Sequence, residues 1–220
     1  MRRSIFACLM VLFPTAAFAQ AGDEAPAEAA EAAPAPAPGP ATFKVSNGKT
    51  SLLVRTYKGG VMSAVAHDHA IASTQTSGTI TWDAAAGACT MDITVDVPSL
   101  RVDAAQDRRK LGLDGDVGAD DQAEIRKNMM AADQLNAAAH KTMTFKSTAC
   151  SASKVTGSLT IRGKSKTVSF TPKLDTSAGF SLSGGFDMKH TDFGFDGYSA
   201  ALGAIRNEDK LTMKFTVVGE

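Results

Sequence analysis

The 220-residue sequence has few aromatic residues, no surplus of either charge and no catalytic signature. Its 23 basic and 23 acidic residues cancel, so it lacks the charge expected of a protein that binds nucleic acid or an anionic membrane. No run after residue 20 is apolar for long enough to span a bilayer. A G-x-S-x-G motif, a glycine-rich phosphate loop and a Cys-His pair with an orienting partner are also missing, and we therefore expect no enzymatic activity.

The N-terminal region combines an export signal with a spacer. Arg2 and Arg3 precede an apolar run that ends at the A-x-A motif Ala17-Phe18-Ala19, which predicts a signal peptide over residues 1–19 and a periplasmic or secreted protein. Residues 20–41 are rich in Ala, Pro and Glu and hold five of the eight prolines, so they predict a disordered linker. Residues 42–220 are the right size for one folded domain.

Two cysteines, Cys89 and Cys150, remain after removal of the leader that contains Cys8. If strands 89–98 and 142–150 are antiparallel neighbours, their register brings Cys89 opposite Cys150, and an oxidising compartment favours a disulfide. Strict alternation places the two side chains on opposite faces, so this pairing requires a β-bulge or a frayed strand end. The alternative is a pair of buried free thiols.

Short runs of alternating apolar and polar residues dominate the rest of the chain. The clearest is 89–98, in which Cys89, Met91, Ile93 and Val95 share one face. Asn47-Gly48, between two such runs, predicts a hairpin. About nine or ten strands of even spacing predict an all-β antiparallel barrel or sandwich. The predicted strands span 43–45, 51–57, 61–71, 76–82, 89–98, 142–150, 155–162, 166–172, 180–188 and 211–217.

A helical insert interrupts the strands between residues 101 and 140. Asp121-Gln122-Ala123-Glu124 has the form of a helix start, and Ile125 and Met129 give the helix an apolar stripe. Residues 133–139 predict one or two further helical turns. The charge run 107–110 (D-R-R-K) predicts the solvated face of a helix.

The stretch 61–71 (V-M-S-A-V-A-H-D-H-A-I) holds two of the four histidines. If it is extended, His67 and His69 lie on the face of Val65 and Ile71. The pair could ligate a metal, with a third ligand from His140, His190 or an acidic side chain. Alternatively, the two rings are polar groups that hydrogen-bond a neighbouring strand or the head of a ligand. The spacing alone leaves both interpretations open.

The serial order of the motifs over residues 43–218 resembles the YceI-like family. H-D-H at 67–69 is followed by Gly78, and V-T-G-S-L-T-I-R-G-K-S-K-T-V occupies 155–168. The other carriers of the resemblance are V-P-S-L-R-V-D at 97–103, I-R-K-N-M-M at 125–130, K-T-M-T-F-K-S at 141–147 and T-D-F-G-F at 191–195. The chain departs from the family pattern in its H-D-H sequence and in a longer Asp/Gly-rich insert over 111–121.

The resemblance implies an exported antiparallel lipocalin-like β-barrel of about eight or more strands, with a short helix near its mouth. It also implies that a polyisoprenoid or quinone-like lipid lies inside the barrel, for carriage or storage in the periplasm. No cofactor is expected to be required, and the expected partner is a small apolar lipid. Both a monomer and a homodimer are compatible with the sequence. The rival functions are a periplasmic metal-binding module that uses His67 and His69, and a stress-response or adhesion barrel without a ligand.

The inward faces of the strands and the helix stripe supply the residues expected to contact the lipid, although the same periodicity describes a filled core. Methionine favours an adaptable lining. Arg101, Arg162 and Arg206 are candidates to bind the polar end of the lipid. The expected ligand-binding residues are Val65, His67, His69, Met91, Ile93, Val95, Met129, Met143, Phe145, Leu159, Ile161, Val168, Phe170, Phe180, Met213 and Phe215.

Overall fold

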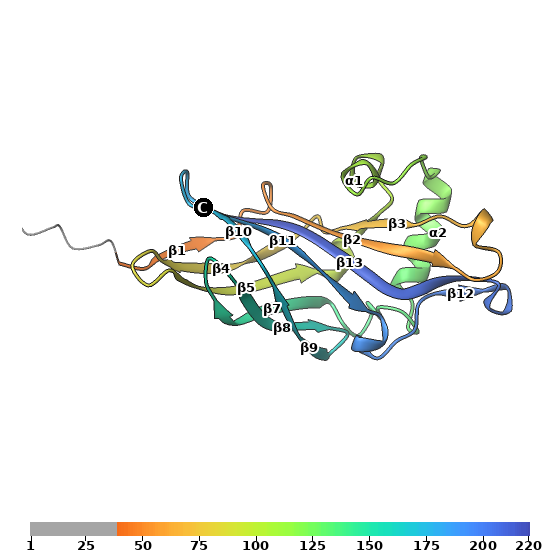
Figure 1. Cartoon of the computed structure of the whole chain (residues 1–220). Coiled ribbons are helices and arrows are strands. Elements are labelled where there is room, and N and C mark those ends of the chain that lie inside the picture. Colours follow the sequence, from red (N-terminus) through yellow and green to blue (C-terminus); the bar gives the residue numbers. More distant parts are fainter. Residues whose placement is uncertain (1–38) are drawn as a thin grey trace, which may run out of the picture. The chain divides into compact units, whose positions relative to one another are not determined.

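The structure, a computed structural model, describes residues 39–220. The predicted signal peptide and all but the last residues of the predicted linker lie outside this range. Two antiparallel sheets dominate the described chain (Figure 1). The first contains, in spatial order, β1 (Ala41–Lys44), β4 (Thr76–Asp83), β5 (Ala88–Asp96), β7 (Thr142–Cys150), β8 (Val155–Ile161) and β9 (Lys164–Phe170). The second contains β10 (Lys173–Asp175), β11 (Phe180–Lys189), β13 (Ile205–Gly219), β2 (Ser51–Gly59), β3 (His69–Ala72) and β6 (Arg101–Val102), and β12 (Ser199–Ala200) also pairs with β13.

The strands form where the sequence alternates between apolar and polar residues. In β8, every second residue from Val155 to Ile161 is buried, and the residues between them are half-buried. In β5, Cys89, Met91 and Ile93 are buried on one face. Successive strand side chains point to opposite faces of a sheet, so each sheet turns an apolar face inward. The predicted antiparallel all-β class is confirmed.

The predicted barrel differs from the structure in how it closes. Among residues 39–220, the strand ladders form two separate sheets, which are joined at one corner by an isolated bridge between Val45 and Gly219. Next to this bridge, Lys44 and Glu220 exchange two backbone hydrogen bonds of 2.8 Å. The cavity described below therefore lies between two facing sheets, without a continuous ring of hydrogen bonds around it.

The hairpin predicted at Asn47-Gly48 is wrong, although the chain does turn there. β1 pairs with β4 in one sheet, whereas β2 pairs with β3 and β13 in the other. The Asn47 side chain binds a different loop: its Oδ1 accepts from the Thr76 amide at 2.6 Å and its Nδ2 donates to the Thr74 carbonyl at 3.1 Å. The Asn-Gly turn thus passes the chain from one sheet to the other.

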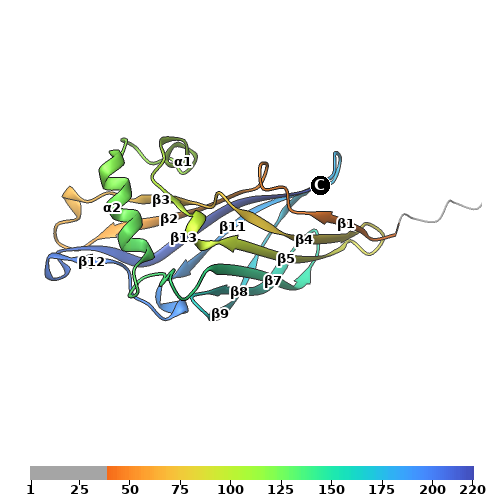
Figure 2. The ribbon, with the colours of Figure 1, turned by 180° about the vertical axis from the view of Figure 1, so that it is seen from behind.

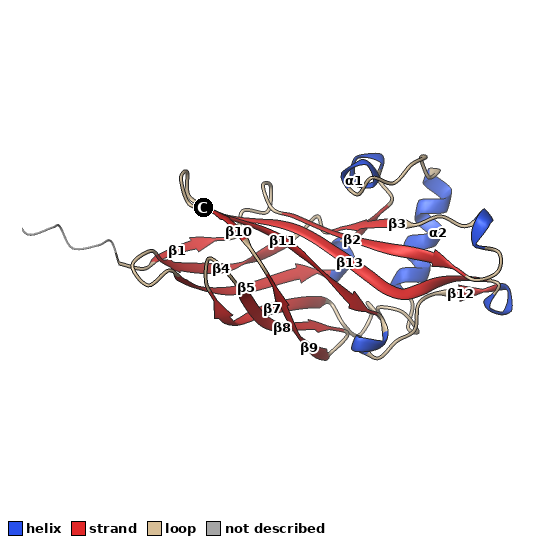
Figure 3. Cartoon of the chain, in the orientation of Figure 1, coloured by secondary structure: helices blue, strands red, loops and turns tan. Residues whose placement is uncertain are grey.

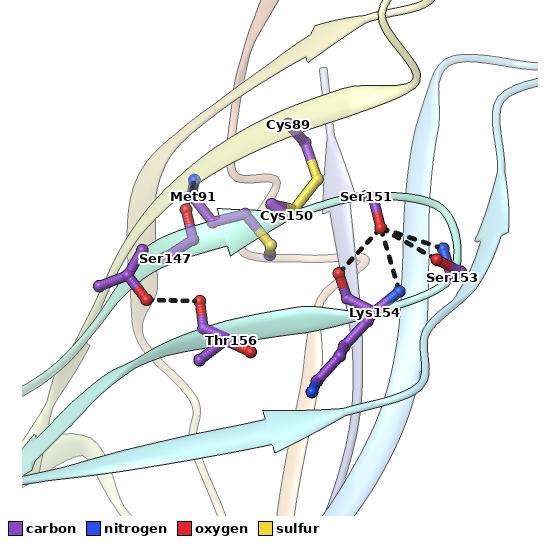
Figure 4. The surroundings of a disulfide bond; sticks show 9 residues. Cys89, Met91, Ser147, Cys150, Ser151, Ser153, Lys154 and Thr156 are labelled. Carbon is purple, nitrogen blue, oxygen red and sulfur yellow. Dashed lines mark hydrogen bonds between the residues drawn. A yellow bond between two sulfur atoms is a disulfide. The ribbon is translucent and has the colours of Figure 1, made fainter.

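A disulfide links Cys89 of β5 to Cys150 of β7, as the register predicted (Figure 4). The required β-bulge is present, because the pairing of β7 with β8 shifts between Ser147 and Ala149. At the bulge, the Met91 amide donates to Ser147 Oγ at 2.8 Å in place of a backbone carbonyl. The extra residue turns Cys150 to the buried face that Cys89 already occupies.

Two α-helices lie in the predicted insert, α1 (Ala105–Lys110) and α2 (Ala119–Met130) (Figure 3). α2 begins at Ala119, two residues before the predicted start, and residues 133–139 form turns instead of the expected helix. α2 stands across the end of the sheets opposite to β1 (Figures 1 and 2). No helix within residues 39–220 has both the length and the apolar character needed to cross a membrane. The short 3-10 helices are η1 (Ser63–Val65), η2 (Val97–Ser99), η3 (Thr191–Phe193) and η4 (Ala201–Gly203).

Apolar side chains fill the end of the sheets where β1 lies. The ring centroid of Phe180 is 5.9 Å from that of Phe43 and 6.3 Å from that of Trp82. The disulfide sulfurs belong to the same buried cluster. This end is therefore a packed core, and the open space between the sheets lies nearer to α2.

Candidate ligand cavity

A cavity of about 480 Å³ lies between the two sheets and reaches α2. Its volume falls within the range of ligand sites, which is roughly 300–1,000 Å³. β5, β7 and β8 line it from the first sheet, and β2, β3, β11 and β13 line it from the second. Ile125 and Met129, the predicted apolar stripe of α2, line its end. The interior is thus partly hollow, which the sequence left open.

The structure brings most of the expected ligand-binding residues together around this cavity. The exceptions are Val168 and Phe180, which are buried in packed clusters and do not line it. Residues that both the sequence and the structure place at the cavity are Val65, His67, His69, Met91, Ile93, Val95, Met129, Met143, Phe145, Leu159, Ile161, Phe170, Met213 and Phe215.

The histidine stretch is less regular than predicted. β3 begins only at His69, and the preceding residues form a turn and the 3-10 helix η1. Val65 lies in η1 and is 72% exposed, so it belongs to the rim of the cavity. His67 and His69 nevertheless both line the cavity, with ring centroids 4.7 Å apart and a T-shaped arrangement. The two rings meet without a continuous strand through both.

Asp103 holds His69 in place from behind. Its Oδ2 lies 2.6 Å from His69 Nδ1, and its Oδ1 accepts from the Ala70 amide at 2.7 Å. The Asp103 amide in turn donates to the Ala70 carbonyl at 2.7 Å. Asp103 is almost fully buried and has a left-handed backbone with φ of 51°, a conformation that aspartate tolerates better than most residues. The carboxylate therefore fixes both the strand β3 and the ring of its first residue.

Arg108 of α1 completes this buried arrangement. Its Nη1 donates to Asp103 Oδ1 at 2.9 Å and to the Asp68 carbonyl at 2.8 Å. Its Nε and Nη2 donate to the carbonyls of Gly115 and Asp114, both at 2.7 Å. One guanidinium thus connects the histidine strand to the Asp/Gly-rich insert.

The prediction that residues 107–110 form a solvated helix face is wrong for two of the four residues. Asp107 and Arg108 are 2% and 3% exposed. Arg108 is paired with Asp103, and Asp107 accepts from Arg101 Nε at 2.8 Å. Burial of a charge is tolerated when an opposite charge and hydrogen bonds compensate the lost hydration. Both partners, Arg101 and Asp103, precede α1 and lie outside the charge run, so the run alone did not reveal them.

The electrostatics of this cluster favour an ionised Asp103 and a neutral His67. Burial by itself raises the pKa of Asp103, but hydrogen bonds from His69, the Ala70 amide and Arg108 outweigh it and lower the pKa below its usual range. Burial, followed by the proximity of His69, lowers the pKa of His67. A lowered pKa favours the uncharged form of the His67 imidazole.

His67, His69 and Asp103 also form a group of metal-ligand type, with donor atoms within 4.8 Å of one another. The hydrogen bonds of Asp103 limit this group. One carboxylate oxygen faces His69 Nδ1, and the other accepts from Ala70 and Arg108. Asp103 thus has the position of a carboxylate that orients a histidine, a common outer-sphere role at metal sites. The nitrogen atoms of the two imidazoles are then the atoms of the group that could ligate a metal.

The three arginines that were expected to bind the polar end of the lipid lie in different places. Arg101 is paired with Asp107, and Arg162 donates to the Ala132 carbonyl at 2.9 Å, outside the cavity lining. Arg206 of β13 does line the cavity. His190 also lines it and is 5% exposed, and burial lowers its pKa.

Sequence reasoning missed Thr56, Asp103 and Arg108. Asp103 lies in the V-P-S-L-R-V-D motif and Arg108 in the charge run 107–110, and no local pattern assigns either residue a role in the cavity. Thr56 of β2 lines the cavity, is 3% exposed, and its hydroxyl is without a hydrogen-bond partner among residues 39–220. The alternation of Leu52, Val54 and Thr56 along β2 was available in the sequence as a signal for its inward direction.

Comparison with known proteins agrees with this architecture. The family model of the YceI-like domain matches residues 42–218. The chain belongs to the YceI-like family. A search of curated proteins returned no match.

Two solved structures are among those similar to this YceI-like chain. BcnA of Burkholderia cenocepacia is 21% identical, with a TM-score of 0.58 over 80% of this chain and 99% of BcnA. The Campylobacter jejuni YceI protein is 17% identical, with a TM-score of 0.48 over 68% of this chain and 84% of its own. The similarity to BcnA shows a shared fold.

Proposed function

We propose that the protein is an exported carrier or store for one long apolar lipid of the isoprenoid or quinone class. The observation that carries this proposal is the 480 Å³ cavity with its apolar lining from both sheets and α2. Membership of the YceI-like family supports the same ligand class, because the family resemblance implies a polyisoprenoid inside the fold. The predicted signal peptide and the Cys89–Cys150 disulfide support export, since disulfides persist in oxidising compartments.

The cavity volume sets the size of the bound segment. At roughly 30 Å³ per water-sized group, 480 Å³ accommodates about sixteen such groups, which corresponds to three or four isoprene units. Burial of sixteen groups at about 0.8 kcal/mol each gives roughly 13 kcal/mol. An association cost of about 5 kcal/mol leaves roughly 8 kcal/mol, or micromolar affinity. Longer tails are expected to extend past α2.

Native mass spectrometry with geranylgeraniol tests the proposal. We expect one lipid per chain for the wild type. Val54→Trp inserts an indole into the cavity lining and is expected to reduce binding by more than tenfold. Thr79→Trp, on an exposed position of β4, is the matched control and should bind as the wild type does. Absence of uptake by the folded wild type, or equal binding by both variants, would contradict the proposal.

A metal-binding function is the second candidate, and the proximity of His67, His69 and Asp103 favours it. The two histidines would be the ligands and Asp103 would orient His69. Zinc commonly requires three or four protein ligands, so this group offers fewer free donors than a closed site. Elemental analysis of the purified protein and of His67→Ala decides between the functions: a stoichiometric metal that is lost in the variant supports the metal, and its absence supports the lipid.

A further inference from the structure

The hydroxyl of Thr56 is an unsatisfied polar group inside an otherwise apolar cavity lining. Thr56 is 3% exposed, and its Oγ1 makes no hydrogen bond among the described residues. A buried polar group without a partner destabilises a protein, and such groups are rare in folded chains. Its side chain lies at the cavity, so a bound molecule could supply the missing partner.

His69 stands directly beside Thr56. The two residues are register partners on the antiparallel strands β2 and β3, so their Cβ atoms are about 5 Å apart on one face of the sheet. The His69 Nδ1 faces the Asp103 carboxylate at 2.6 Å. In the neutral ring this contact retains the proton on Nδ1 and leaves Nε2 as a hydrogen-bond acceptor. The cavity wall therefore presents a hydroxyl and an imidazole acceptor side by side.

We propose that Thr56 and His69 form a subsite for a neutral hydroxyl at the head of the bound lipid. This inference rests on the proposed function. The ligand oxygen accepts from the Thr56 hydroxyl, and the ligand O–H donates to His69 Nε2. A lipid alcohol or a phenolic hydroxyl satisfies both groups at once, whereas an ether or a carbonyl oxygen can only accept.

The charges around the subsite disfavour an anionic head. Asp121 and Glu124 of α2 line the same cavity and add negative charge at its end. The buried Arg108 near His69 is not available to bind an anionic head, because its guanidinium is paired with Asp103. Arg206 also lines the cavity but is exposed. Its positive charge could attract a phosphate, so a phosphorylated lipid is the competing ligand.

Binding of three related probes tests the subsite: geranylgeraniol, its methyl ether and geranylgeranyl phosphate. We expect the wild type to bind the alcohol about tenfold more tightly than the ether, since the ether cannot donate to His69. Thr56→Val retains the shape of the side chain and removes only the hydroxyl. It should weaken the alcohol by about tenfold, and it should also weaken the ether, whose oxygen can accept from Thr56 but cannot donate to His69. Thr90→Val, on an exposed position of β5, is the matched control and should change neither affinity.

Thermal unfolding of the empty protein gives an independent readout. Removal of an unsatisfied buried hydroxyl stabilises the fold, so Thr56→Val should unfold a few degrees above the wild type when no lipid is present. Equal affinity of the wild type for alcohol and ether, a preference for the phosphate, or unchanged alcohol binding in Thr56→Val would overturn the hydroxyl subsite. Failure of all three probes to bind the wild type would instead refute the proposed lipid-binding function.

Discussion

Reduction of the Cys89–Cys150 disulfide should destabilise the protein by about 4 kcal/mol. The bond closes a loop with a sequence separation of 61 residues. In the chain-entropy description, a cross-link over a loop of this length stabilises the folded state by about 4 kcal/mol because it restricts the unfolded chain. For a chain of this size, that free energy corresponds to a decrease in the melting temperature of roughly 8–16 °C.

Differential scanning calorimetry of the mature protein, with and without a reductant, measures this effect. Both cysteines are 8% exposed and pack in the core, so the reductant must be equilibrated with the unfolded protein before refolding. Comparison of the oxidised and reduced wild type retains both sulfur atoms and thereby separates loop closure from packing. The double variant Cys89→Ala/Cys150→Ala is the control and should not respond to the reductant.

Oxidised and reduced forms that unfold within about 1 kcal/mol of each other would contradict this stabilisation, because that difference is a small part of the expected value. Two titratable thiols in the unfolded, unreduced mature protein would contradict the disulfide itself. The first result would mean that loop closure contributes little to the stability, and the second would mean that the two cysteines are ordered without being joined.

Two further substitutions test the packing and the electrostatics. Asp103→Asn should lower the free energy of unfolding at pH 7 by about 3–5 kcal/mol. Because the folded pKa of Asp103 is lowered, its contribution is present above about pH 4 and is lost as the pH falls towards the folded pKa. The free energy of unfolding, measured with urea between pH 7 and pH 2.5, should therefore fall less steeply with decreasing pH in the variant than in the wild type. Equal slopes would contradict an ionised, paired Asp103. Gly157→Ala would place a Cβ 2.4 Å from the Phe145 ring and 2.6 Å from the Lys146 carbonyl oxygen, and should cost about 1–3 kcal/mol. Gly48→Ala meets nothing within 4 Å and should be neutral in the same unfolding assay.

The strands were predictable because their signal is local. Alternation with a period of two identifies β5, β7, β8 and β9 from the sequence alone. The same alternation placed most of the cavity residues on inward faces. It could not separate Val168 and Phe180, which fill packed clusters, from Met91 and Met213, which line the cavity. Both kinds of residue are apolar and face inward, so alternation alone does not tell which of them line the cavity.

The arrangement of the strands was harder to predict, as β1 and β2 show. Asn47-Gly48 has the composition of a hairpin turn, yet it connects strands of different sheets. Strand pairing depends on which edges the rest of the chain leaves free, and a turn dipeptide carries no such information. The disulfide register was predictable because β5 and β7 are neighbours in the sheet and leave few ways to align two cysteines.

The sequence by itself determined the antiparallel strand class, the cysteine pair, the resemblance to the YceI-like family and the inward direction of most apolar side chains. The tertiary structure alone decided that the interior holds a cavity, that Asp103 and Arg108 are buried partners, and that Thr56 faces His69 with an unpaired hydroxyl. The physical reason is the separation along the sequence of the residues that interact. A local pattern reports which way a side chain points, whereas the energy of a buried polar group depends on what folding brings opposite to it from another part of the chain.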